Sequence, residues 1–167
     1  MGVFDSGIGG LTVAREIMRQ IPNEKIIYFG DTARVPYGGK SRETITRYSR
    51  QIVRFLQARE VKVIVVACNT ASAYALDEIE KETDIPMIGV VKPGARVAAA
   101  TTVNGKVGVI GTEGTIGSSI YSRYIKKINP QVTVTGKACP LFTPLVEGAL
   151  GGPGHGRDCQ KVSCGAS

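Results

Sequence analysis

Residues 61–74 read VKVIVVACNTASAY, and this stretch decides the fold. Its first seven residues are almost all Val, Ile or Ala, which is typical of a strand buried on both faces of a parallel sheet. The polar, small residues Cys68, Asn69 and Thr70 follow at once, and a helical pattern begins at Ala71. A buried strand that passes through a short polar turn into a helix predicts an α/β protein.

The same strand–helix unit recurs along the chain. Strands are predicted at Gly2–Phe4, Ile26–Gly30, Val61–Ala67, Met87–Val91, Val107–Gly111 and Val132–Thr135. Helices are predicted at Leu11–Gln20, Arg42–Ala58, Ala71–Thr83, Gly94–Thr101 and Ile116–Ile128. Ser41 is placed to cap the second of these helices. We therefore predict an α/β fold whose parallel sheets are flanked by helices.

A weak internal repeat predicts two similar lobes. GVFDSG (2–7) and GVIGTE (108–113) each combine a short strand with a small polar turn. We predict a first lobe over residues 1–92, a partial second lobe over 93–147 and an irregular tail over 148–167. That Gly-rich tail holds His155, Cys159 and Cys164, but their spacing matches no standard zinc pattern, so we predict no metal site.

Composition narrows the functional classes. The 167 residues carry a net charge of +7, and aromatic residues make up only 6%. We interpret the charge as a solvated face, because no nucleic-acid-reading motif accompanies it. No apolar run approaches the roughly 20 residues that a membrane helix needs. We therefore expect a cytoplasmic protein with reduced cysteines, no nucleic-acid partner and no membrane contact.

The candidate chemistry gathers where strands end. Asp5 and Ser6 follow the first strand, Asp31 the second and Cys68 the third. In a parallel sheet these junctions share one edge, where free helix N–H groups suit an anion such as a carboxylate. GIGG (7–10) also suggests a phosphate loop, but Asp5 would repel phosphate, so we interpret this segment as a tight turn.

Cys68 is the most informative residue. Its position at the start of a helix would favour the thiolate form. The alternative is a buried small hydrophobe, the commonest fate of a free cysteine. The hydrogen-bonding neighbours Asn69 and Thr70 favour a reactive thiol. The only histidine lies in the tail, which disfavours a Cys–His nucleophile and leaves a cysteine that moves a proton.

Six motifs in order resemble the glutamate racemases of the aspartate/glutamate racemase family. They are GVFDSGIGGLTV (2–13), YFGDTARVPYG (28–38), VACNTAS (66–72), IGVVKPGA (88–95), VGVIGT (107–112) and ACPLFTPLVEG (138–148). The resemblance implies a cofactor-independent enzyme that interconverts L- and D-glutamate in a cleft between two α/β lobes. One cysteine thiolate removes the α-proton and an opposite thiol delivers a proton to the other face. D-glutamate then enters peptidoglycan, and family members often form homodimers.

The resemblance also implies roles for individual residues. Cys68 would be one of the two catalytic cysteines, with Asp5 and Glu147 as assisting acids. The residues that would contact glutamate are Asp5, Ser6, Tyr37, Gly38, Asn69 and Thr70.

The sequence departs from the family after Glu147. The family's second cysteine lies in a Gly-Cys-Thr-His-Tyr-Pro motif, and none of Cys139, Cys159 and Cys164 has that context. We therefore expect a truncated or frame-shifted racemase with an incomplete second lobe. The alternatives are a non-catalytic remnant that binds an amino acid, and an aspartate-type racemase of the same superfamily.

Overall fold

A four-stranded parallel sheet forms the first unit of the structure. The computed structural model describes the backbone of residues 1–150 and the side chains of residues 1–146. The strands are β1 (Gly2–Asp5), β2 (Ile27–Gly30), β3 (Ile64–Val66) and β4 (Met87–Gly89), in the spatial order β2-β1-β3-β4. Every residue of β1 and β3 is buried, which confirms the parallel, two-faced burial predicted from their apolar sequences.

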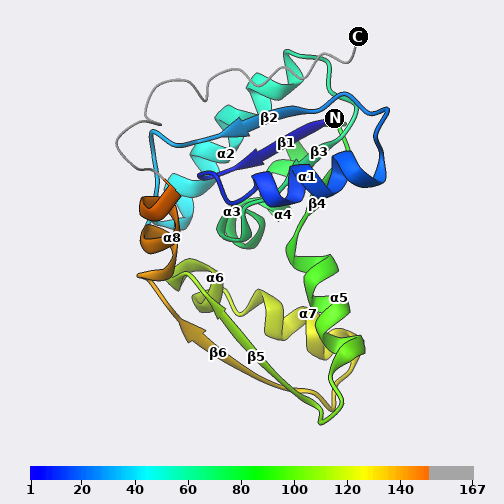
Figure 1. The fold of residues 1–167 in the computed structure, drawn as a ribbon, viewed down its shortest axis with the longest axis vertical. Helices are drawn as coiled ribbons and strands as arrows, with labels where there is room; N and C mark the ends of the chain where they lie inside the picture. Colours follow the sequence, from blue (N-terminus) through cyan, green and yellow to red (C-terminus); the bar gives the residue numbers. More distant parts are fainter. Residues whose placement is uncertain (151–167) are drawn as a thin grey trace.

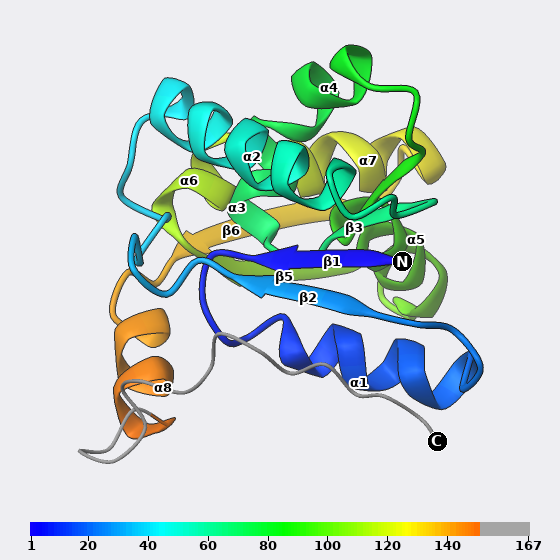
Figure 2. The same ribbon diagram turned by 90° about the horizontal axis from the view of Figure 1, so that it is seen from above.

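Helices cover both faces of this sheet (Figure 2). On one face, α1 (Leu11–Gln20) packs Ala14 near Val3, Val65 and Ala67. On the other face, Phe4 joins a larger core. The elements on that face are α2 (Arg42–Gln57), α3 (Asn69–Tyr74), α4 (Leu76–Ile79) and the 3-10 turn η1 (Glu80–Glu82). The neighbouring residues Val3 and Phe4 of β1 thus pack into cores on opposite faces of the sheet, because side chains alternate along a strand.

The second unit contains a two-stranded parallel sheet (Figure 1). Its elements are α5 (Val91–Thr101), β5 (Lys106–Gly111), α6 (Glu113–Gly117), α7 (Ile120–Ile128), β6 (Thr133–Ala138) and α8 (Phe142–Leu150). Val107 and Val109 of β5 face a core formed with α5 and α7, whereas Lys106 and Ile110 are exposed. The Val- and Ile-rich sequence of β5 predicts burial on both faces, as for residues 61–67. This prediction is wrong within residues 1–146, because no described helix covers the face that carries Lys106 and Ile110.

The structure contains one helix that begins earlier than predicted and one that was not predicted, and each has a proline in its first turn. The strand predicted at residues 87–91 ends at Gly89, and α5 begins at Val91, three residues before the predicted start. Pro93 is then the third helical residue, and Pro144 has the same place in the unpredicted α8. The first four N–H groups of a helix have no acceptor within it, so proline is tolerated there.

Two of the longer predicted helices are divided. The pattern at residues 71–83 corresponds to α3, α4 and η1, and the pattern at 116–128 is broken between α6 and α7. Ser119 takes a left-handed backbone conformation at the second break, with φ of 54°. By contrast, α1 has the predicted bounds, and Ser41 caps α2 as predicted, accepting a hydrogen bond from the Thr44 N–H at 3.3 Å. No helix among the described residues has both the length and the apolar character needed to cross a membrane.

Candidate active site

The carboxyl edge of the first sheet brings together three residues predicted from the sequence. β1 pairs with both β2 and β3, so Asp5 and Ser6 leave the sheet beside the end of β3. The Cys68 thiol, just beyond β3, donates to the Ser6 hydroxyl at 3.3 Å. The parallel register thus joins residues that lie 62 positions apart in the sequence.

Cys68 is a buried thiol at the start of a helix. Its side chain is 4% exposed, and its sulfur accepts a hydrogen bond from the Ala71 N–H at 3.4 Å, which makes it the N-cap of α3. Burial raises the pKa of Cys68 to about 11, and the negative charge of Asp5 adds to this shift. Hydrogen bonds that Ser6 and the Ala71 N–H donate to the thiolate form lower the pKa but do not outweigh burial. The start of α3 therefore lowers the pKa of Cys68 as predicted, but burial raises it more, so the thiol form dominates at neutral pH.

Asp5 organises the turn that follows β1. Asp5 is 7% exposed, and its carboxylate accepts hydrogen bonds from the N–H groups of Gly7 at 3.3 Å and Gly10 at 2.9 Å. A side chain at Gly10 would lie 2.6 Å from the Asp5 Cβ and 2.9 Å from the Ala67 Cβ. The GIGG segment is thus a tight strand-to-helix turn folded around a carboxylate, the interpretation favoured from the sequence.

Tyr37 and Gly38 belong to a loop over residues 31–40 that follows β2. Tyr37 is 2% exposed, shares a buried cluster with Cys68 and donates to the Asp31 carboxylate at 2.5 Å. Burial and this bond raise the pKa of Tyr37 well above its usual range. The Gly38 carbonyl accepts from the Gly114 N–H of α6 at 3.1 Å, so the loop reaches the second unit.

Asn69 and Thr70 also contact the second unit. The side-chain amide oxygen of Asn69 accepts from the Tyr121 hydroxyl at 2.7 Å, and the Thr70 hydroxyl lies 2.9 Å from that of Thr112. Thr115 lies 3.4 Å from Thr70 and completes a cluster of three hydroxyls.

The sequence analysis did not select Thr112, Thr115 or Tyr121. The internal repeat contained a signal for Thr112, which occupies the same place after β5 that Ser6 occupies after β1. The Cys68–Thr70 turn is accordingly contacted by the equivalent hydroxyl of each repeat.

The other predicted groups are not placed at this edge. Cys139 is half-buried beyond β6, with its sulfur 3.7 Å from the Lys137 carbonyl. Glu147 lies on α8, but its side chain is outside the described part, as are His155, Cys159 and Cys164 of the tail. Within the described residues, no three His, Cys, Asp or Glu side chains gather in a way that could hold a metal ion.

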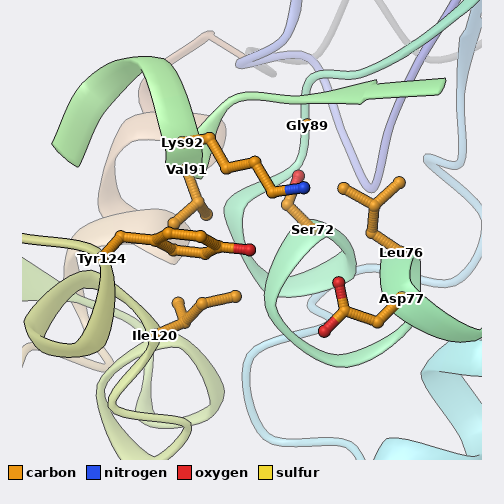
Figure 3. Close-up of a pocket in the computed structure, with 8 residues that line it drawn as sticks. All are labelled: Ser72, Leu76, Asp77, Gly89, Val91, Lys92, Ile120 and Tyr124. Atoms are coloured by element: carbon orange, nitrogen blue, oxygen red, sulfur yellow. The ribbon is translucent and has the colours of Figure 1, made fainter. Parts of the chain in front are cut away.

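A small pocket lies where β4 passes into α5 (Figure 3). Leu76, Asp77, Val91, Lys92 and Tyr124 are among the residues that line it. None of the predicted site residues lines it, so this pocket is distinct from the group around Cys68, although Gly89 places it at the same carboxyl edge of the sheet.

Comparison with known proteins gives the family. Residues 8–150 match the family described as Asp/Glu/Hydantoin racemase. The chain belongs to this racemase family, which confirms the resemblance of its motifs. It is 62% identical over 147 residues to a glutamate racemase of Geobacter metallireducens, covering 88% of this chain and 54% of the relative. A glutamate racemase of Oceanobacillus iheyensis is 53% identical over 154 residues, covering 92% and 56%.

Solved racemase structures share the fold. A glutamate racemase isoform from Bacillus anthracis matches with a TM-score of 0.86 at 47% identity, over 89% of this chain and 56% of that one. The glutamate racemase of Francisella tularensis, solved with D-glutamate, matches with a TM-score of 0.82 at 46% identity, over the same shares. This racemase-family chain therefore spans about half the length of the relatives that it matches.

Proposed function

We propose that this chain acts in the interconversion of L- and D-glutamate by cofactor-independent proton transfer, with Cys68 as one of two proton-carrying cysteines. The observation that carries the proposal is the buried thiol of Cys68, held by Ser6 and the start of α3 at the sheet edge where α/β proteins bind ligands. The relatives supply the substrate class, because they are glutamate racemases.

The groups around Cys68 suit an amino-acid substrate. The Ser6 hydroxyl, the Asn69 amide and the Thr70 hydroxyl can donate to an α-carboxylate, and Asp5 can accept from an ammonium group. Tyr37 and Gly38 would complete the substrate site. A carboxylate bound here would displace hydrogen bonds that these side chains now make with each other and with the second unit.

The protonation state of Cys68 decides whether it donates or removes a proton first. With a pKa of about 11, the sulfur carries a proton at neutral pH. We infer that Cys68 is the donor in the resting protein: its S–H delivers a proton to one face of the substrate carbanion, while the opposite thiolate removes the α-proton from the other face. The next turnover, which starts from the thiolate of Cys68, runs in reverse.

The opposite cysteine is the second requirement of this mechanism. The sequence contains no Gly-Cys-Thr-His-Tyr-Pro motif, so these 167 residues do not supply the cysteine that faces Cys68; we propose that Glu147 assists that cysteine where it is present. We further propose a cytoplasmic protein, without a nucleic-acid partner, whose product D-glutamate serves peptidoglycan synthesis. Homodimer formation also stays a prediction.

Incubation with L-glutamate in deuterated water tests the proposal. We expect loss of the α-proton signal in NMR spectra, abolished by Cys68→Ser, whereas net formation of D-glutamate also requires the opposite proton carrier. Cys139→Ser is the matched control, because its sulfur contacts only a backbone carbonyl in the described structure, and it should retain exchange. Exchange that persists in Cys68→Ser, or is absent from the unaltered chain, would refute catalysis by this chain.

An amino-acid binder without catalysis is the second candidate. The raised pKa of Cys68 favours it, because a thiol that stays protonated cannot act alone as a base. Calorimetric titration with L-glutamate separates the two: saturable binding without deuterium exchange identifies a binder. Parallel titration with L-aspartate tests the aspartate-type alternative, which requires the shorter acid to bind more tightly.

A further inference from the structure

Asp31 is a buried carboxylate in the loop of residues 31–40, at the end of β2. Its side chain is 4% exposed, and its own N–H donates to the Asp5 carbonyl at 2.9 Å, which continues the pairing of β2 with β1. Its two oxygens accept from the Tyr37 hydroxyl at 2.5 Å and from Arg34 Nε at 2.9 Å. Both bonds are charge-assisted, and such bonds are stronger than neutral ones.

Arg34 ties the same carboxylate to α2. Its guanidinium donates to the side-chain amide oxygen of Gln51 at 2.6 Å and lies 4.3 Å from the centre of the Tyr48 ring. Asp31 is therefore fixed from the sheet and from α2 together, so its position does not depend on the second unit.

From Tyr37 the loop passes directly to the second unit. Gly38, the next residue, accepts from the Gly114 N–H at 3.1 Å. A side chain at Gly38 would lie 2.6 Å from the Thr112 Cβ, so backbone and α6 are in close contact here. Thr112 in turn meets Thr70, two residues from Cys68. The loop thus joins the buried carboxylate to the first turn of α6.

We propose that Asp31 is a positioning residue: through Tyr37 it holds Gly38 against the first turn of α6 and so sets the second unit relative to Cys68. Neither Asp31 nor Arg34 is among the residues proposed above to contact substrate. That this placement serves glutamate chemistry rests on the proposed function, whereas the linkage between the two units stands without it.

The Gly114 N–H is a direct reporter of the contact. It is the second residue of α6, where an N–H has no acceptor within the helix. Its bonded partner is the Gly38 carbonyl of the first unit. Protection of this amide from hydrogen exchange therefore measures how firmly the loop is held.

The test compares amide hydrogen exchange at Gly114, read by NMR, in the unaltered full chain and four variants of it. Asp31→Asn keeps the shape of the side chain but removes its charge, and Tyr37→Phe keeps the buried ring but removes the hydroxyl. The double variant combines them, and Glu82→Gln is a matched acid-to-amide control at the exposed ion pair with Arg50. The Ala67 N–H donates a hydrogen bond to the Phe4 carbonyl at 2.8 Å within the first sheet, and its exchange reports on opening of the whole fold.

We expect Gly114 to exchange about tenfold faster, relative to Ala67, in each single variant, and no faster in the double variant than in the more affected single one. Glu82→Gln should match the unaltered chain. Unchanged Gly114 exchange in both single variants would overturn the proposal, as would effects that multiply in the double variant, because independent actions multiply.

A glutamate titration separates this proposal from the proposed function. If the unaltered chain binds L-glutamate, Asp31→Asn should weaken binding several-fold while Glu82→Gln leaves it unchanged; equal binding by Asp31→Asn would overturn the positioning role. If the unaltered chain binds no glutamate, the proposed function fails, and the exchange result alone decides the linkage.

Discussion

Two glycines of the site loops have opposite surroundings, although the sequence presents them alike. Gly10 faces the Asp5 and Ala67 Cβ atoms at 2.6 and 2.9 Å from a built Cβ, whereas Gly39 faces nothing within 4 Å. We expect Gly10→Ala to lower the free energy of unfolding by about 1–3 kcal/mol, because neither neighbour can rotate away. Gly39→Ala should stay within about 0.5 kcal/mol. Urea unfolding of both variants checks this, and an unchanged Gly10→Ala would contradict it.

The raised pKa of Cys68 predicts that its reaction with alkylating reagents depends on pH in a higher range than for an ordinary cysteine. With a pKa of about 11, about one molecule in ten thousand carries the thiolate at pH 7. Alkylation of Cys68 should therefore accelerate through pH 10–11. Mass spectrometry of the modified residue follows it, with Cys139 as internal reference. Alkylation of Cys68 that levels off near pH 8.5 would contradict the burial argument.

The same shift predicts a loss of stability at high pH. The folded chain holds the Cys68 proton more tightly than the unfolded chain, where the pKa is near 9. The stabilisation is therefore complete below pH 9 and is lost as the pH rises through 11, by at most about 3 kcal/mol. Unfolding free energies of the unaltered chain and Cys68→Ser, compared at pH 8 and 11, isolate this group from other titrating residues. A difference that is constant with pH would disprove it.

At the scale of elements, α2 depends on a cap that the sequence already indicated. Ser41 accepts from the Thr44 N–H and is exposed, so its substitution changes little besides the cap. Ser41→Ala should cost about 1 kcal/mol, whereas Ser41→Asp, which also caps well, should be close to neutral. Thermal unfolding followed by circular dichroism measures both. Equal losses in the two variants would show that the cap is not the cause.

The elements also show where sequence patterns fail. Short apolar runs located the six described strands of the two sheets, although β6 extends to Ala138, beyond its predicted end at Thr135. The same patterns placed the start of α5 too late and missed α8; Pro93 and Pro144 occupy the first turns of these two helices, where proline is tolerated. The ends of helices depend on which N–H groups need acceptors, and that is not visible in periodicity.

At the scale of the whole molecule, α8 and the residue before it expose an apolar patch. Leu141, Phe142, Leu145 and Val146 are 69%, 54%, 66% and 58% exposed. Clustered apolar surface of this kind promotes association. We expect concentration-dependent self-association in sedimentation velocity, reduced by Leu145→Lys. Val97→Lys, at a residue of α5 that is 61% exposed and lies outside this patch, is the control and should not reduce it. Equal effects of both variants would assign the association to net charge instead.

The sequence by itself determined the fold class, the parallel strands, the sheet edge at which polar residues gather, and the family. These depend on the local order of apolar and polar residues, which is visible along one chain segment. Only the tertiary structure decided that the Cys68 thiol is buried and protonated, that Thr70 meets Thr112, and that Asp31 holds Tyr37. A pKa and a contact between the two units depend on desolvation and distance among segments far apart in the chain, and no local pattern encodes these.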